Sequence, residues 1–140
     1  MKNKFTVEKY DMSLLNGWHL KDKNQKLHAT ALTKEFTGIF ALAKWEPSFI
    51  KDEVLKVLNK DTKIVYLHNF ESFKDSNKNA IKYILNHIKE YYKNNGFDYI
   101  ITYEIKTNYQ YQKLIDNGFQ NICNTKNKAY EISYFIYNLH

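Results

Sequence analysis

The sequence predicts an α/β (α+β) fold, in which one mixed and mostly antiparallel sheet is flanked by helices. First, the first half of the chain is rich in strand-like segments, and the second half has the order β-α-β-α-β-β. Second, 140 residues with 44% hydrophobic and 26% charged side chains are enough for a single domain, residues 1–140, with its own core. Third, the segment from Lys63 to Phe70 is apolar on both faces in its middle, which is typical of a central strand.

The first half of the chain divides into short segments with strand or helix character. Alternating apolar and polar residues indicate a strand, whereas apolar residues three and four apart indicate a helix. We therefore expect a strand over residues 5–10, a short helix over 11–17, a polar loop over 21–26 and a hairpin of strands over 27–33 and 37–45. A further helix is expected to begin at Pro47, with an apolar face formed by Ile50, Val54, Val57 and Leu58.

The second half of the chain has the stronger signals. The helix that begins at Ala80 carries a regular apolar stripe and ends near Gly96, which suits the left-handed cap position. Asn108 is expected to cap a shorter helix that closes at Gly118. Strands are predicted over residues 97–105, 121–124 and 129–139. Because the strands before and after the long helix would be parallel, their connection should be a right-handed crossover.

The charge of the chain comes from lysine alone. The formal net charge is +6, and the sequence contains no arginine. Arginine is the residue that reads guanine and clamps phosphates with a planar fork, so its absence argues against base-specific DNA recognition. Lysine still provides a diffuse attraction for nucleic acids and anionic cofactors. The heavy use of Lys, Asn, Ile, Tyr and Phe is typical of an AT-rich genome, which is an alternative origin for the basic charge.

The remaining composition limits the compartment and the kind of site. Cys123 is the one cysteine, which excludes an internal disulfide and a multi-cysteine metal site. The five histidines lack metal-ligand spacing, so we expect no metal. No apolar run approaches the roughly 20 residues that a membrane helix needs, and the first residues do not resemble a signal peptide. We therefore expect a cytoplasmic protein without a membrane partner.

The segment from Lys63 to Phe119 resembles the GNAT superfamily of acyl-CoA N-acyltransferases. The resemblance rests on the order of a central strand (Ile64–Phe70), a loop (Lys74–Asn79), a helix from Ala80, a second strand and a short helix that ends in Gly118-Phe119. It covers about the last half of the chain and implies a GNAT-like fold. It also implies acetyl-CoA or a related acyl-CoA as cofactor, and an amine as acyl acceptor.

In this family, backbone N–H groups of the loop and the dipole of the following helix hold the coenzyme pyrophosphate. The resemblance therefore implies coenzyme contacts from Lys74, Ser76, Asn77, Lys78, Asn79, Ala80 and Asn108. The family pattern of the loop is Q/R-x-x-G-x-G/A, and here Asn77 and Asn79 stand where glycine is usual. Asparagine tolerates a positive φ better than other non-glycine residues, and Lys74 and Lys78 can add compensating charge.

Acyl transfer to an amine needs a base for the amine proton and an acid for the departing thiolate. His68, Glu71 and Glu104 lie near the strand ends where the resemblance places a cleft, and they are the candidate bases. The family's tyrosine acid lies four residues before the glycine of Gly-Phe, and this chain has Leu114 there. Tyr111, about one 5.4 Å turn earlier, is a candidate acid, and Tyr103 is the other.

These features predict a GNAT-like acyl-CoA-dependent N-acetyltransferase that acts on an unidentified amine. The glycine-free loop and the missing tyrosine also fit a different class of protein. That alternative is a catalytically inactive GNAT-like binding or inhibitor protein of phage or mobile-element type, whose partner is a host protein or a nucleic acid. A third, weaker signal is His28-Ala29-Thr30, which matches half of the paired motif of 2H phosphoesterases.

Overall fold

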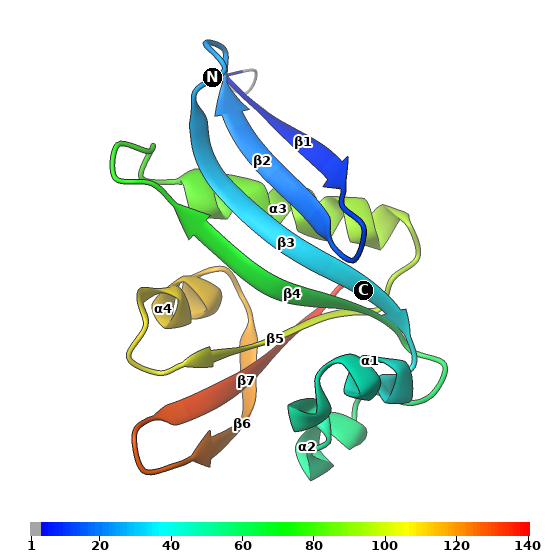
Figure 1. Cartoon of the computed structure of the whole chain (residues 1–140). Helices are drawn as coiled ribbons and strands as arrows, with labels where there is room; N and C mark the ends of the chain where they lie inside the picture. The colour runs from blue at the N-terminus through cyan, green and yellow to red at the C-terminus, as the bar shows by residue number, and fades with distance from the viewer. Residues whose placement is uncertain (1–3) are drawn as a thin grey trace.

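One seven-stranded sheet runs through the protein in the order β1-β2-β3-β4-β5-β7-β6 (Figure 1). The computed structural model describes residues 4–140. The strands are β1 (Phe5–Asp11), β2 (Asn16–Asp22), β3 (Leu27–Thr37), β4 (Lys63–Ser72), β5 (Tyr99–Ile105), β6 (Gln120–Lys126) and β7 (Glu131–Asn138). The helices are α1 (Ile39–Trp45), the short 3-10 helix η1 (Pro47–Phe49), α2 (Asp52–Leu55), α3 (Ala80–Asn94) and α4 (Tyr109–Asp116).

Strands β4 and β5 form the single parallel pair of the sheet among the described residues, and every other neighbouring pair is antiparallel. Helix α3 connects these two strands, as a crossover between parallel strands requires. The predicted fold class, a mixed and mostly antiparallel sheet flanked by helices, is therefore confirmed.

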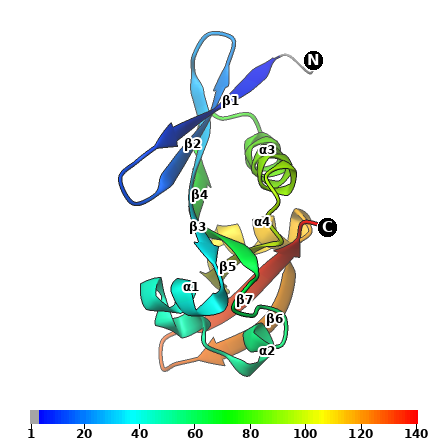
Figure 2. The same ribbon diagram turned by 90° about the vertical axis from the view of Figure 1, so that its right-hand side faces the viewer.

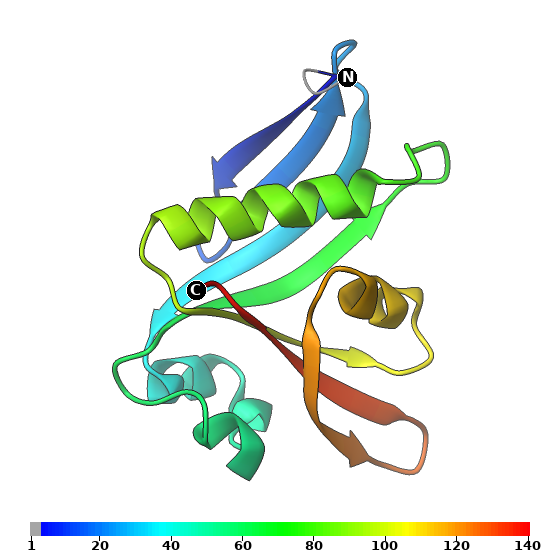
Figure 3. The same cartoon turned by 180° about the vertical axis from the view of Figure 1, so that it is seen from behind.

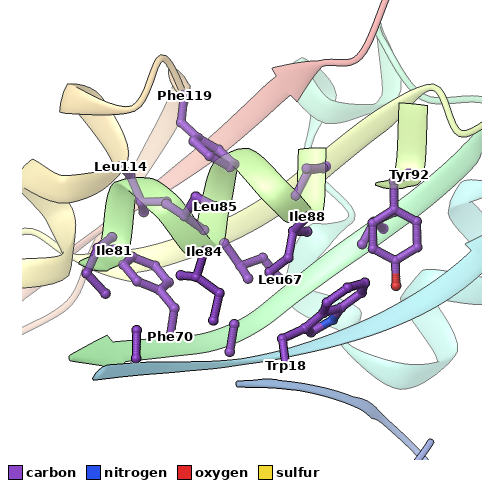
Figure 4. Packing of buried hydrophobic residues seen from close by; sticks show 14 of the residues in the cluster. Trp18, Leu67, Phe70, Ile81, Ile84, Leu85, Ile88, Tyr92, Leu114 and Phe119 are labelled. Atoms are coloured by element: carbon purple, nitrogen blue, oxygen red, sulfur yellow. The ribbon is translucent and has the colours of Figure 1, made fainter. Parts of the chain in front are cut away.

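Helices cover the sheet on both faces (Figure 2). Helix α3 lies on one face, and its apolar stripe packs on β2, β3 and β4 (Figure 4). The stripe predicted from the sequence is buried in this core, namely Ile81, Ile84, Leu85, Ile88 and Tyr92. On the opposite face, the segment from α1 to α2 buries Leu42, Phe49 and Val54 in a second core under β4, β5 and β7. The region where β4 meets β5 is thus packed from both sides.

Two segments of the first half differ from the sequence prediction. Residues 11–17 do not form a helix, because a tight turn, closed by the Met12 N–H and the Leu15 carbonyl at 2.9 Å, leads straight into β2. Trp18 and Leu20 then alternate into the core as strand residues. Residues 37–45 do not form a strand, because the chain turns at Gly38, with φ of 90°, and continues as α1.

The expected helix from Pro47 is shorter than predicted and divides into η1 and α2. Val54 and Leu58 are buried as expected, whereas Ile50 and Val57 are exposed. The strong elements of the second half match their predicted positions, because β4, α3, β5 and α4 lie within two residues of the expected bounds.

A buried hydrogen-bond chain ties β2, β3 and α3 together. The Trp18 Nε1–H donates to the Thr33 hydroxyl at 2.8 Å, and the Thr33 and Tyr92 hydroxyls lie 2.9 Å apart. All three residues have no exposed surface. Replacing Thr33 by valine keeps the shape but leaves the indole N–H without an acceptor, so we expect the free energy of unfolding to fall by about 1–3 kcal/mol.

Urea denaturation measures this loss, and Thr37→Val at the exposed end of β3 is the matched control. If both variants unfold at the same urea concentration, the hydrogen-bond chain contributes no net stability.

Candidate functional site

Strands β4 and β5 diverge after a short parallel stretch. Their pairing stops after three residue pairs, of which Tyr66 and Ile101 are the last. Beyond that point the Thr102 hydroxyl donates to the Leu67 carbonyl at 2.7 Å, which satisfies a main-chain acceptor where the ladder ends. Figure 3 shows the first turn of α3 and helix α4 on the same side of the sheet, beside the diverging strand ends.

A bulge in β4 accompanies the divergence. Leu32 of β3 lies opposite Asn69, whereas Thr33 lies opposite Leu67, so His68 is an extra residue in β4. A bulge bends its strand and changes the direction of neighbouring side chains. Accordingly His68 and Asn69, although consecutive, are both exposed, whereas a regular strand would turn one of them into the core.

Three amide groups of the loop before α3 are already satisfied. The Asn77 N–H donates to the His28 imidazole Nδ1 at 2.9 Å. The Asn79 N–H donates to the side-chain carbonyl of Asn77 at 2.8 Å, and the Ala80 N–H donates to the main-chain carbonyl of Asn77 at 3.0 Å. The side chain of Asn77 therefore occupies one of the donors that the family resemblance assigns to the coenzyme.

Other donors at the same helix start stay open. The main-chain N–H groups of Lys78, Ile81 and Lys82 donate no hydrogen bond to any acceptor among residues 4–140. Two of these belong to the first turn of α3, where the helix dipole favours an anion. The start of α3 also borders a hollow of about 150 Å³, lined by Lys78, Asn79, Ile81 and Lys82 and, from the end of α4, by Lys113, Asp116 and Asn117. Three lysines and one aspartate give it a net positive charge.

The remaining coenzyme candidates have different environments. The Ser76 hydroxyl donates to the main-chain carbonyl of His28 at 2.6 Å, and it accepts the Phe73 N–H at 2.9 Å. Ala80 is buried behind the helix start, and Lys74 is exposed on the loop. Asn108 stands at the N-cap of α4, as predicted, but its side chain donates to Glu104 at 2.7 Å and not to the helix. Of the seven residues that the sequence analysis assigns to the coenzyme, Lys78 and Asn79 are therefore the two that line this hollow.

His28 anchors this loop to the sheet. Its Nδ1 accepts the Asn77 N–H, so its Nε2 carries the proton and donates to the Asp22 carboxylate at 2.9 Å. The same hydrogen bond to His28 lowers the pKa of Asp22. His28 is only 7% exposed, and all its polar groups serve the loop and the hairpin beside it. This arrangement gives the His28-Ala29-Thr30 sequence a structural role.

The three candidate bases lie in separate surroundings. His68 is exposed at the bulge, with its ring centroid 5.5 Å from that of Tyr66 and the two rings nearly perpendicular. Glu71 lies further along β4 and lines a hollow of about 400 Å³ on the sheet face that α3 does not cover. Glu104 on β5 accepts the Asn108 amide and the Ile105 N–H, so it organises the start of α4. His68 lies closest in sequence to the point of divergence.

The two candidate acids lie on opposite faces of the sheet. Tyr111 of α4 packs in the core beneath α3, with its ring centroid 5.4 Å from that of Phe135. Tyr103 of β5 borders the other core, where its hydroxyl donates to Glu46 at 3.0 Å. Burial, and then the neighbouring Glu46 carboxylate, raise the pKa of Tyr103.

Glu46 is a polar residue of this region that the sequence analysis missed. It follows α1 and accepts hydrogen bonds from Tyr103 and from the Ser48 hydroxyl, the latter at 2.9 Å. The sequence analysis predicts a strand over residues 37–45 and a helix from Pro47, and it assigns no role to Glu46 between them. The one signal in the sequence is its position before Pro47, at a boundary between elements, where functional polar residues are common.

Metal and membrane sites are not evident among the described residues. Residues 4–140 contain no group of three or more His, Cys, Asp or Glu side chains placed to hold a metal ion. In the same part of the chain, no helix has the length and hydrophobicity to span a bilayer.

Comparison with known proteins identifies the fold. No protein-family model and no curated protein sequence matches the chain. Among solved structures, the ribosomal-protein-S18-alanine N-acetyltransferase from Escherichia coli superposes with a TM-score of 0.61 and 11% identity, over 92% of this chain and 72% of that one. NAA60 from Arabidopsis thaliana in complex with acetyl-CoA gives 0.64 and 13%, over 91% and 77%.

A GNAT-family acetyltransferase from Listeria monocytogenes gives a TM-score of 0.57 and 13% identity, over 87% of this chain and 63% of that one. At these identities the similarity shows the fold alone. The chain has a GNAT-like fold, as the sequence resemblance predicted.

Proposed function

We propose that this protein, whose fold is GNAT-like, is an acyl-CoA-dependent N-acetyltransferase that uses acetyl-CoA. The observation that carries the proposal is the divergence of β4 and β5 beside an open, lysine-lined helix start. A thioester needs a gap in the main-chain ladder to reach an acceptor, and a pyrophosphate needs unpaired N–H donors and positive charge. This chain places both features next to each other.

The residues at the start of α3 fit the anionic part of the coenzyme. The main-chain N–H groups of Lys78, Ile81 and Lys82 are free to donate to phosphate oxygens, and Lys113 adds charge from the opposite wall. The coenzyme, when bound, supplies an acyl group activated as a thioester. The absence of glycine from the loop does not close this site, because the satisfied amides of Asn77 and Asn79 lie before the first turn of the helix.

We assign the acid by the face of the sheet on which it lies and the base by its exposure near the point where β4 and β5 diverge. Tyr111 is on the α3 side of the sheet, and its hydroxyl has no hydrogen-bond partner among residues 4–140, so it is free to donate a proton to a thiolate there. His68 is exposed at the bulge and is the base that we favour. Glu104 and Asn108 bind each other, and Glu71 lies beyond the bulge, so these residues are less suited to proton transfer at the divergence.

Calorimetric titration with acetyl-CoA tests the proposal, together with a thermal unfolding scan. At 100 times the dissociation constant, binding should stabilise the protein by about 2.7 kcal/mol. The control is S-acetyl-N-acetylcysteamine, a thioester without phosphates, which should bind far more weakly. Absence of binding at millimolar acetyl-CoA would refute the function. Binding without acyl transfer to any of a panel of amines would favour the inactive, non-enzymatic alternative.

A further inference from the structure

His28 joins the loop before α3 to the sheet only while its ring is neutral. Its Nδ1 accepts the main-chain N–H of Asn77 at 2.9 Å, and its Nε2 donates to the Asp22 carboxylate at 2.9 Å. A main-chain N–H can only donate, so Nδ1 carries no proton in this arrangement. A proton on Nδ1 would place two N–H groups against each other and would leave the Asn77 N–H without its acceptor.

A bulge in β3 turns His28 toward this loop. The pairing with β2 passes from Ala29 directly to Leu27, so His28 is an extra residue in its strand. His28 and Ala29 are consecutive and both buried, whereas a regular strand would turn one of them away from the core. The imidazole consequently packs against the ring of Phe5, with the centroids 5.1 Å apart and the planes nearly perpendicular.

Two further hydrogen bonds attach the loop to the hairpin of β2 and β3. The main-chain carbonyl of His28 accepts the Ser76 hydroxyl at 2.6 Å, and the Lys26 ammonium donates to the main-chain carbonyl of Asp75 at 2.9 Å. A hydroxyl and an ammonium keep their protons at neutral and mildly acidic pH, whereas histidine changes its charge between about pH 5 and 8. Of these three attachments, the one through the imidazole is therefore the one that responds to pH in this range.

Asn77 in turn orders the start of α3. Its side-chain carbonyl accepts the Asn79 N–H at 2.8 Å, and its main-chain carbonyl accepts the Ala80 N–H at 3.0 Å. The open N–H groups of Lys78 and Ile81 directly precede and follow these two residues. Their direction therefore depends on where Asn77 is held, and a loop that has lost this attachment must be ordered again when an anion binds.

The charged and titratable side chains around the imidazole come from every neighbouring element. They are Asp22 of β2, Lys26 of the following turn, Asp75 of the loop, Lys4 beside the Phe5 ring, and Tyr83 and His87 of α3, which line a hollow with Phe5 and Asn77. The hydrogen bond from His28 lowers the pKa of Asp22, so this carboxylate stays charged and attracts a protonated ring. Protonation thus keeps the bond to Asp22 and breaks the bond to Asn77.

We propose that His28 is the positioning residue of the coenzyme loop, and that protonation of its imidazole releases the loop and weakens the binding of acetyl-CoA. The affinity is therefore highest above about pH 7, where histidine is neutral, and it falls as the pH falls through the range in which histidine gains a proton. His28 acts through Asn77 and not by contact with the coenzyme. The inference rests on the proposed acetyltransferase function and specifies how pH regulates its coenzyme site.

The first test compares the wild-type protein with His28→Asn by calorimetric titration of acetyl-CoA at about pH 7.5 and about pH 5.5. The side-chain oxygen of asparagine takes the place of Nδ1, accepts the Asn77 N–H and gains no proton in this range. We expect the wild-type affinity to fall about 10-fold more than that of His28→Asn, because the loss of an acceptor for a buried N–H changes an equilibrium by about that factor. The coenzyme phosphates titrate equally in both experiments, so their contribution cancels.

Two further variants separate the acceptor atom from the ring. His28→Gln keeps a donor for Asp22 but lacks the acceptor at Nδ1, so it should bind acetyl-CoA weakly at both pH values. His87→Asn removes the other histidine beside the loop, whose pKa burial lowers, and it should respond to pH like the wild type. Equal falls in affinity for the wild type and His28→Asn, or a pH response that disappears in His87→Asn, would overturn the inference.

Hydrogen exchange followed by NMR tests the release of the loop without coenzyme. The protection factor of the Asn77 N–H should fall about 10-fold in the wild type between the two pH values and stay constant in His28→Asn. A constant protection factor in the wild type contradicts the inference, even where His28→Asn proves too unstable to measure. Failure of acetyl-CoA to bind at the higher pH contradicts the acetyltransferase function, whatever the exchange measurement gives.

Discussion

Replacing Gly38 by alanine is expected to destabilise the protein by more than about 3 kcal/mol, enough to unfold much of it at 37 °C. Gly38 has φ of 90° and ψ of 145°, a conformation that is almost confined to glycine. A Cβ atom on this residue would lie 2.3 Å from the main-chain carbonyl oxygen of Lys60. The Gly38 N–H donates to the Thr62 carbonyl at 2.7 Å, so the segment before β4 would have to move as well.

Gly96→Ala is the matched control for this prediction. Gly96 also has a positive φ, 80°, but within residues 4–140, apart from Gly96 itself and its two chain neighbours, no heavy atom lies within 4 Å of the position that a Cβ would take. We expect this variant to lose only about 1–2 kcal/mol, the ordinary cost of a left-handed alanine. Urea denaturation of both variants measures the difference. Equal losses would show that the Lys60 main chain yields easily and that the close approach at Gly38 is unimportant.

Reversing the charges of two lysines that line the hollow between the start of α3 and the end of α4 is expected to lower the affinity for acetyl-CoA by at least about 100-fold. The variant combines Lys82→Glu with Lys113→Glu, on the two walls of the hollow where we place the coenzyme phosphates. Each charge-assisted hydrogen bond contributes about 1.5–3 kcal/mol, and a carboxylate in its place adds repulsion. Calorimetric titration gives the dissociation constants at low and at moderate salt, and the wild-type affinity should fall as salt rises.

The control combines Lys56→Glu with Lys128→Glu, two exposed lysines outside this hollow. It changes the net charge of the protein by the same amount. If both double variants lose the same affinity, attraction by the whole basic protein explains binding and the hollow has no special role. A loss confined to the Lys82 and Lys113 variant places the phosphates at the start of α3.

Elements with a long, regular pattern were predictable from the sequence. Helix α3 carries five apolar residues at helical spacing over four turns, and its partner β4 is apolar on both faces, so local pattern and tertiary packing agree. Helix α1 was predicted as a strand because its seven residues are apolar almost without interruption, which does not distinguish the two structures. Its helical form depends on the turn at Gly38 and on burial of Leu42, both of which are tertiary effects.

The candidate site also combines residues whose position follows from local sequence with residues whose position depends on tertiary packing. The order of strand, loop and helix placed Lys78 and Asn79 at a helix start, because that order is local in sequence. The bulge at His68 depends on the register between β3 and β4, which no local pattern specifies. Glu46 reaches Tyr103 across 57 positions of sequence, so only the packing of η1 on β5 brings the two residues together.

The narrow junction between β4 and β5 also has a mechanical consequence. Three residue pairs join the two halves of the sheet there, while β4 continues from Leu67 to Ser72, over about 20 Å, paired with β3 and no longer with β5. A rotation of a few degrees about this junction would move the far end of β4 by an ångström or more relative to β5, and would so change the gap between the two strand ends. The hydrogen bond from Thr102 to Leu67 lies just beyond the last of these pairs and adds one more connection between the two halves at the junction.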